Sequence, residues 1–113
     1  MNEKVAIVGS RSFTPLSKVR EYISQLPLDT IIVSGGAEGV DRQAVGWARV
    51  LQMETLVFKP DWDKYGKSAG ILRNTQIVDA CDRLVAFWDG ESKGTKDSID
   101  KARKAGKQVV IIK

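Results

Sequence analysis

The sequence predicts an α/β fold in which a parallel sheet of about five strands lies between two layers of helices. The first observation is that short apolar runs alternate with segments whose apolar residues recur at helical spacing. The second is that most glycines follow the apolar runs, where a strand would turn into a helix. Strands that alternate with helices form βαβ units, whose strands lie parallel. At 113 residues, the chain has the length of one domain, spanning residues 1–113.

Each predicted strand is a short run rich in β-branched residues, which is typical of strands buried on both faces of a sheet. These runs cover residues 5–8, 30–33, 55–58, 84–88 and 109–112. Glycines follow each of the first four runs before the next helical segment begins. Because the carboxyl ends of parallel strands meet at one edge of the sheet, we expect these glycine turns to converge there.

Each predicted helix carries a stripe of residues three or four positions apart. The stripes are Leu16, Val19, Ile23 and Leu26; Ala44, Val45, Ala48 and Leu51; Leu72, Thr75, Val78 and Cys81; and Ile99, Ala102 and Ala105. Strands and helices together predict a single Rossmann-like domain, a three-layer α/β/α sandwich.

The composition narrows the classes of function. A net charge of +4 suits either an anionic ligand or a mixed surface with spare lysines. The sequence has no histidine, the most frequent general base and zinc ligand, and we expect neither a metal site nor a cofactor. The single cysteine, Cys81, is expected to be a small buried side chain in a reducing compartment. With no signal peptide and no apolar run of membrane length, the sequence predicts a cytoplasmic protein without a membrane partner.

The loop after the second run, residues 34–41, is the strongest candidate for a ligand site. Its predicted ligand-binding residues are Ser34, Gly35, Gly36, Gly39 and Asp41. Its glycines allow the backbone to approach a ligand closely, and the helix that follows offers unpaired N–H groups to an anion. Asp41 is open to two interpretations, a carboxylate that caps the start of the helix or an acceptor for a ribose or base.

The turn after the first run contributes Gly9, Ser10 and Arg11 to the predicted site. The planar guanidinium of Arg11 suits phosphate or carboxylate, although it could equally be an exposed side chain in a turn. Thr14 is predicted to cap the first helix, with Pro15 at its first position.

The turn after the fourth run is a second candidate phosphate cradle. It contributes Gly90, Gly94 and Thr95, and Thr95 is predicted to cap the last helix. The third helix adds Arg73 and Asn74. Because a cation near a helix N-terminus is electrostatically unfavourable, Arg73 indicates an anionic ligand.

The connection after the third run is long, which is frequent at functional sites. Its aromatic residues, Trp62 and Tyr65, could stack on a base or pack the loop onto the sheet. Gly66-Lys67-Ser68 resembles the end of a P-loop, but position 61 is Asp where that motif needs glycine. The dinucleotide fingerprint G-x-G-x-x-G is not matched either, because position 34 is Ser.

These motifs form an ordered set that covers nearly the whole chain. They are Gly9-Ser10-Arg11, the loop at 34–41, the tryptophan-bearing segment at 44–48, Trp62, the segment at 65–70, Arg73-Asn74 and Gly94-Thr95. As a set they resemble the SLOG superfamily of Rossmann-like proteins, which includes DprA and the LOG phosphoribohydrolases, and most closely its small YspA-related group. The resemblance implies a site for a nucleotide or nucleotide-derived ligand, allows a homodimer, and implies that DprA-like relatives use this surface for single-stranded DNA.

The resemblance also bears on catalysis. LOG-type hydrolases carry a catalytic glutamate three residues after the threonine of their glycine motif, and an arginine on the preceding helix. Arg73 resembles that arginine, but Ser98 occupies the glutamate position and Asp97 lies one residue earlier. We therefore expect a nucleotide-binding or sensor domain. The alternatives are a hydrolase of N-glycosidic bonds with Arg73 and Asp97 as catalytic residues, in which Glu91 could replace Asp97, and a DprA-like binder of single-stranded DNA.

Overall fold

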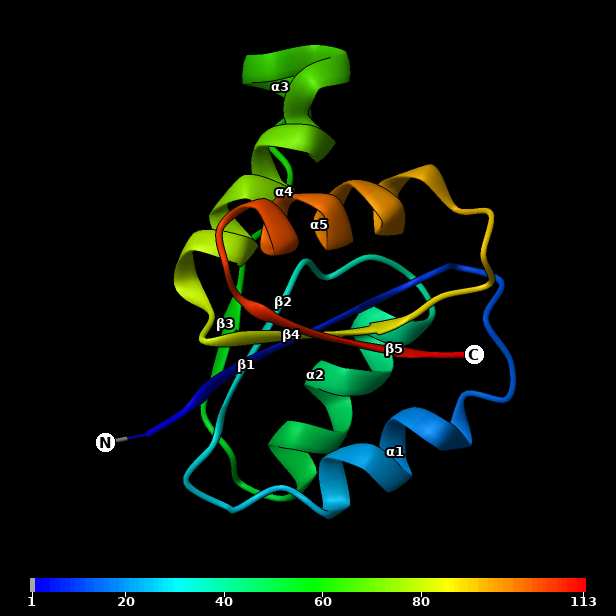
Figure 1. The fold of residues 1–113 in the computed structure, drawn as a ribbon. Helices are drawn as coiled ribbons and strands as arrows, with labels where there is room; N and C mark the ends of the chain where they lie inside the picture. Colours follow the sequence, from blue (N-terminus) through cyan, green and yellow to red (C-terminus); the bar gives the residue numbers. More distant parts are fainter. Residues whose placement is uncertain (1) are drawn as a thin grey trace.

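A computed structural model describes residues 2–113 and shows strands and helices in alternation (Figure 1). The elements are β1 (Lys4–Gly9), α1 (Ser17–Ser24), β2 (Ile31–Ser34), α2 (Val40–Val50), β3 (Thr55–Val57), α3 (Trp62–Tyr65), η1 (Gly66–Ser68), α4 (Ala69–Ala80), β4 (Arg83–Phe87), α5 (Lys93–Lys104) and β5 (Gln108–Ile112). The strands form one sheet in the order β3-β2-β1-β4-β5, and every neighbouring pair is parallel. The predicted α/β fold with five parallel strands is confirmed.

The sheet has an apolar core on each face, which explains why its strands are continuous apolar runs. Along β1, Val5 and Ile7 join the core on the side of α1 and α2, whereas Ala6 and Val8 join the core on the side of α4 and α5. Figure 1 shows the two helix pairs on opposite sides of the sheet. The three layers follow from this alternation, since successive side chains of a strand point to opposite faces.

The order of the strands reverses direction at β1, which has β2 on one side and β4 on the other. The chain leaving β1 enters α1 on one face, and the chain leaving β4 enters α5 on the other. Because the two connections diverge, a crevice opens between them at the carboxyl ends of the strands. This switch point lies where Gly9 and Phe87 end paired strands.

Two predicted helix starts are wrong. Helix α1 begins at Ser17 after Leu16, without a side-chain cap, so Thr14 and Pro15 lie outside the helix. Helix α5 is capped by Ser92, not by Thr95, and the Ser92 side chain accepts a hydrogen bond from the Thr95 backbone N–H. The residues between them are already helical, which places Thr95 inside the first turn.

The long connection after β3 contains α3 and η1 before α4 begins at Ala69. The predicted apolar stripe of α4 is wrong in its first half, because Leu72 and Thr75 are exposed. The buried positions of α4 are Ala69, Asn74, Ile77 and Val78. The buried stripe includes a polar residue, Asn74, because this part of the helix faces a cavity and not an apolar core.

Cys81 is buried, as predicted. Within residues 2–113, none of the helices combines the length and the apolar character needed to cross a bilayer.

Candidate functional site

A cavity of about 720 Å³ opens at the carboxyl ends of β1 and β4, between α4 and α5. Its volume is in the range of small-molecule sites. Four segments of the chain contribute its lining: the β1–α1 turn, the β2–α2 loop, η1 with α4, and the β4–α5 turn with the start of α5. The switch point of the sheet is therefore hollow, as expected for a ligand site in an open α/β sheet.

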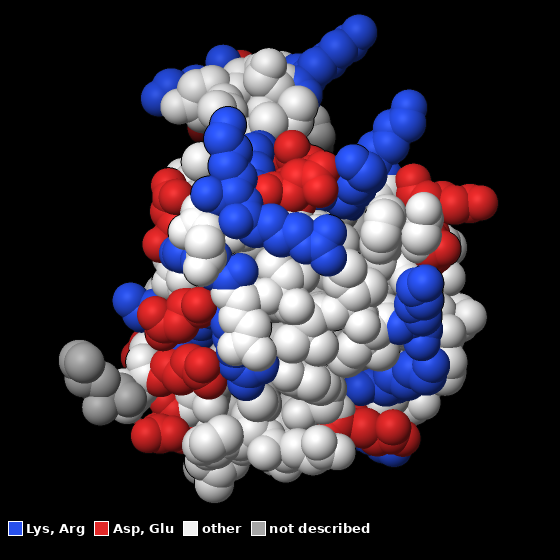
Figure 2. Space-filling model, viewed as in Figure 1, with Lys and Arg blue, Asp and Glu red and all other residues white. Residues whose placement is uncertain are grey.

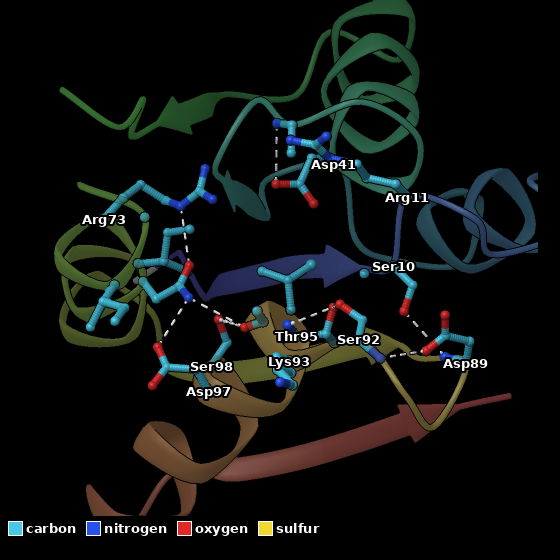
Figure 3. Close-up of a pocket in the computed structure, with 18 of the residues that line it drawn as sticks. Ser10, Arg11, Asp41, Arg73, Asp89, Ser92, Lys93, Thr95, Asp97 and Ser98 are labelled. Atoms are coloured by element: carbon cyan, nitrogen blue, oxygen red, sulfur yellow. Dashed lines mark hydrogen bonds between the residues drawn. The ribbon is translucent and has the colours of Figure 1, made fainter. Parts of the chain in front are cut away.

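The structure brings most of the predicted site residues together around this cavity (Figure 3). The predicted residues that line it are Gly9, Ser10, Arg11, Asp41, Arg73, Asn74, Gly94, Thr95 and Asp97. The predicted residues that do not line it are Ser34, Gly35, Gly36, Gly39 and Gly90. The glycine loop, which the sequence singled out first, thus contributes mainly Asp41 and the unpredicted Ala37 to the cavity wall.

The glycines of the β2–α2 loop make room for two arginines. The carbonyl oxygen of Gly35 accepts a hydrogen bond from Nη1 of Arg73 at 2.8 Å, and a Cβ on Gly35 would overlap that guanidinium. Gly39 has a φ of +84°, and a Cβ there would lie 2.9 Å from the carbonyl oxygen of Arg11. These glycines therefore allow close approach of the chain's own segments and so position Arg11 and Arg73.

Asp41 is a buried carboxyl group that holds the same loop. Its Oδ2 accepts hydrogen bonds from the backbone N–H groups of Gly35 at 3.1 Å and Ala37 at 3.4 Å. Burial raises the pKa of Asp41 from 3.8 to about 6, although Arg73 and the two N–H groups act in the opposite direction. Asp41 does not cap α2, whose N-cap residue is Gly39. Its partners are N–H groups of the preceding loop, and it also faces the cavity.

Arg11 and Arg73 both line the cavity and give it positive charge near Asp41. Figure 3 shows them extending from opposite sides of the cavity toward the region of Asp41. Burial lowers the pKa of Arg73; Asp41 acts against this and the nearby Arg11 adds to it. Within residues 2–113, neither guanidinium has a carboxylate at salt-bridge distance. An anion bound between them would relieve the repulsion of two like charges.

A second network joins α4 to α5 below the arginines. Arg73 Nε donates to Asn74 Oδ1 at 3.1 Å, and Asn74 Nδ2 donates to Asp97 Oδ2 at 3.1 Å and to the Gly94 carbonyl at 3.3 Å. Lys101 forms an ion pair with the same Asp97 oxygen at 2.8 Å. Asn74 thereby fixes the orientation of Arg73 relative to Asp97, which are the two predicted catalytic residues.

The β4–α5 turn is held by Asp89, which the sequence analysis did not identify. Its Oδ1 accepts the backbone N–H groups of Glu91 and Ser92 at 2.8 Å, and these bonds lower its pKa to about 2. Its backbone N–H donates to Ser10 Oγ at 3.2 Å, which ties this turn to the end of β1. The turn is therefore fixed in position beside the cavity without help from a ligand.

The first turn of α5 offers free donors to the cavity. In the described part of the chain, the backbone N–H groups of Lys93 and Gly94 have no acceptor, and both residues line the cavity. The Lys93 side chain and the positive end of the helix dipole add to the attraction for an anion. Lys67 of η1 lines the cavity as well.

Several cavity residues escaped the sequence analysis. The unpredicted lining residues are Val8, Ser12, Ala37, Lys67, Gly70, Ile71, Ile77, Asp89, Ser92, Lys93 and Ser98. Glu91, which was predicted as an alternative to Asp97, lines the cavity as well. The polar residues of the unpredicted group lie next to predicted residues in the same connections between strand and helix, and this position could have identified them as part of the site. The apolar wall had no such signal. Val8 belongs to a strand that is apolar on both faces, and in a helix such as that of Ile71 and Ile77, core residues and ligand-facing residues have the same spacing. Among residues 2–113, no group of three His, Cys, Asp or Glu side chains is placed to hold a metal ion.

Comparison with known proteins gives a family match and a close relative. Residues 3–65 match the model of the family described as the YspA, cpYpsA-related SLOG family. The Gene 61 protein of Mycobacterium phage D29 is 35% identical over 117 residues, which cover 95% of this chain and 94% of that protein.

Two solved structures of DNA processing protein A (DprA) share the fold. The protein from Streptococcus pneumoniae matches 99% of this chain with a TM-score of 0.87 and 23% identity. The protein from Helicobacter pylori, whose structure concerns its binding of single-stranded DNA, matches 96% with a TM-score of 0.75 and 23% identity. The chain spans 50% of the first DprA chain and 64% of the second.

Proposed function

Because the chain belongs to the YspA, cpYpsA-related SLOG family, we propose that it binds a nucleotide or nucleotide-derived ligand in the cavity at the carboxyl edge of its sheet. The observation that carries this proposal is the pair Arg11 and Arg73, which line one cavity without a carboxylate at salt-bridge distance. Two guanidinium groups that face a common space favour a ligand with phosphate between them.

The remaining walls of the cavity suit the other parts of a nucleotide. The free N–H groups of Lys93 and Gly94 would bind phosphate oxygens. The apolar side chains of Val8, Ile71 and Ile77 would contact the face of a base or sugar. Three of the four lining carboxylates, those of Asp41, Asp89 and Asp97, already accept hydrogen bonds from the protein. Their negative charge is thus partly compensated, which lowers their repulsion of phosphate.

Arginine variants test this proposal. Arg11→Ala is expected to weaken binding of nucleoside monophosphates about tenfold or more, because a hydrogen-bonded charge is lost. Isothermal titration calorimetry measures the affinity, and thermal unfolding checks that the fold is intact. The control is Arg49→Ala in the last turn of α2, which does not line the cavity. Equal affinity of the Arg11→Ala and Arg49→Ala proteins, or no binding of any nucleotide by the unaltered protein, would contradict the proposal.

A second candidate function is hydrolysis of the N-glycosidic bond of a nucleoside monophosphate. It is favoured by one observation: Arg73 and Asp97 line the same cavity and are joined through Asn74. Asp97 would accept a proton from the water molecule that attacks the sugar carbon, the carbon–nitrogen bond would break, and the protonated Asp97 would pass that proton to the nitrogen of the leaving base. Arg73 would hold the phosphate.

The test of hydrolysis is release of free base, followed by chromatography. Asp97→Asn is expected to abolish release, whereas Asp100→Asn on the exposed face of the same helix is expected to keep it. Absence of release from every common monophosphate would exclude this activity.

Binding of single-stranded DNA is a further candidate, because the H. pylori DprA structure with the same fold concerns that ligand. Its test is the dependence of oligonucleotide affinity on salt, which should be steep if phosphates are neutralised. A homodimer and a cytoplasmic location stay predictions, and light scattering tests the dimer.

A further inference from the structure

Residues 62–72, which we call the knob, expose large apolar side chains to solvent. The knob comprises α3, η1 and the first residues of α4, and Figure 1 shows α3 standing away from the sheet. Neither α3 nor η1 contains a buried residue. The exposed apolar side chains are Trp62 at 56%, Tyr65 at 45%, Ile71 at 56% and Leu72 at 41%. Trp62 and Tyr65 therefore do not pack the connection onto the sheet, which was one of their two predicted roles.

The knob is continuous with the ligand cavity. Lys67, Gly70 and Ile71 belong to the knob and also line the cavity. The tip of the Trp62 indole, atom Cη2, lies 3.6 Å from the position that a Cβ on Gly70 would occupy. The indole therefore lies beside Gly70, which itself lines the cavity. A ligand that extends out of the cavity past Lys67 and Ile71 would meet the aromatic side chains of the knob.

The charges of the knob suit a ligand with phosphates. Lys64 Nζ lies 5.1 Å from the centre of the Tyr65 ring, and Lys67 is close in sequence. Figure 2 shows basic side chains projecting from this part of the molecule. The Asp61 carboxylate caps α3 by accepting the Lys64 backbone N–H at 3.1 Å, which leaves Asp63 as the exposed acidic group of α3. Aromatic rings beside lysines are the combination that binds successive bases of a nucleic acid or a dinucleotide.

We propose that the knob is a second base-binding platform, so that the ligand carries two bases joined through phosphate. One base would occupy the cavity and the other would stack on Trp62 and Tyr65. This inference rests on the proposed function, because it requires a nucleotide in the cavity. Such a ligand is either a free dinucleotide or a stretch of single-stranded nucleic acid, and both share the same chemistry at this site.

The experiment compares mononucleotides with dinucleotides. Affinities of the common ribonucleoside monophosphates and of the matching phosphorylated dinucleotides are measured by calorimetry for the unaltered protein, Trp62→Ala and Tyr65→Ala. Each aromatic variant is expected to weaken dinucleotide binding about fivefold or more, and to leave mononucleotide binding unchanged. Trp62→Phe is expected to restore most of the dinucleotide affinity, since a ring that stacks is retained. Leu28→Ala removes an exposed apolar side chain that does not line the cavity, and serves as the control.

The outcomes separate the two proposals. One outcome is that the protein binds mononucleotides and binds dinucleotides equally well in the unaltered form and in both aromatic variants. This result would overturn the proposal that the knob binds a second base and would leave the proposed function intact. Absence of binding of every nucleotide would overturn both. A short oligothymidylate distinguishes the two sources of the ligand. If the oligothymidylate binds more tightly than any dinucleotide, if its affinity depends steeply on salt and if Trp62→Ala loses that affinity, the ligand is single-stranded nucleic acid. If the oligothymidylate binds as tightly as a dinucleotide or more weakly, the ligand is a free dinucleotide.

Discussion

The burial of Asp41 predicts an unusual dependence of stability on pH. The perturbation is Asp41→Asn, which keeps a side-chain oxygen that can accept the N–H groups of Gly35 and Ala37 but removes the titratable charge. In the folded chain this carboxyl has a pKa of about 6, above its ordinary 3.8. The folded state therefore holds the proton more tightly than the unfolded state between these two values, and stability falls as the pH rises through this window.

The magnitude follows from the two pKa values. A difference of about two pH units corresponds to about 3 kcal/mol of stability that is present at low pH and lost above about pH 6. Asp89 acts in the opposite direction and in a lower window, because its pKa is lowered to about 2. Its contribution to stability is complete above about pH 4 and is lost as the pH falls toward 2. The decline between about pH 4 and 6 thus belongs to Asp41.

Denaturant unfolding followed by tryptophan fluorescence measures this effect in both proteins from about pH 4 to pH 7. The free energy of unfolding of Asp41→Asn minus that of the unaltered protein is expected to rise by about 2 kcal/mol across this range, the remainder of the effect lying below pH 4. Asp100→Asn, which changes an exposed carboxylate paired with Lys96, is expected to show no such rise. Parallel stability curves for the Asp41→Asn and unaltered proteins would refute the reasoning.

Three further predictions concern the supports of the site. Gly39→Ala is expected to lower the free energy of unfolding by about 2 kcal/mol, because a side chain at a φ of +84° is strained and meets the neighbouring turn. Ser92→Ala is expected to cost about 1 kcal/mol through loss of the α5 cap. Asn74→Asp would place a second carboxylate beside Asp97, and is expected to cost about 2 kcal/mol at neutral pH. Denaturant unfolding checks all three.

Each of these predictions has its own control. Gly46→Ala in the middle of α2, where an added Cβ meets nothing within 4 Å, is expected to stabilise the protein; a stabilising Gly39→Ala would contradict the strain argument. Ser24→Ala changes a serine at the end of α1 and should cost less than Ser92→Ala. Combining Asn74→Asp with Asp97→Asn should recover most of the loss, and failure to recover would show that repulsion is not its cause.

The sequence by itself determined the fold and the edge at which the site lies. Its strands are recognisable because a parallel sheet buried on both faces requires continuous apolar runs. The alternation of runs and helical stripes then fixes parallel pairing, and parallel pairing brings the carboxyl ends of all strands to one edge. For this reason Arg11, Arg73 and Asp97 could be assigned to one site although they lie far apart along the chain.

Only the tertiary structure decided what each residue at that edge contacts. The loop glycines were expected to approach a ligand, but Gly35 and Gly39 accommodate the chain's own arginines. Serine and threonine are both favoured as N-cap residues, so the sequence alone could not show whether Ser92 or Thr95 caps α5. The backbone geometry of the turn makes Ser92 the cap. The exposure of Trp62 likewise depends on which surfaces the rest of the chain covers. Local patterns report periodicity and turn chemistry, whereas close approach and exposure depend on contacts between residues distant in sequence.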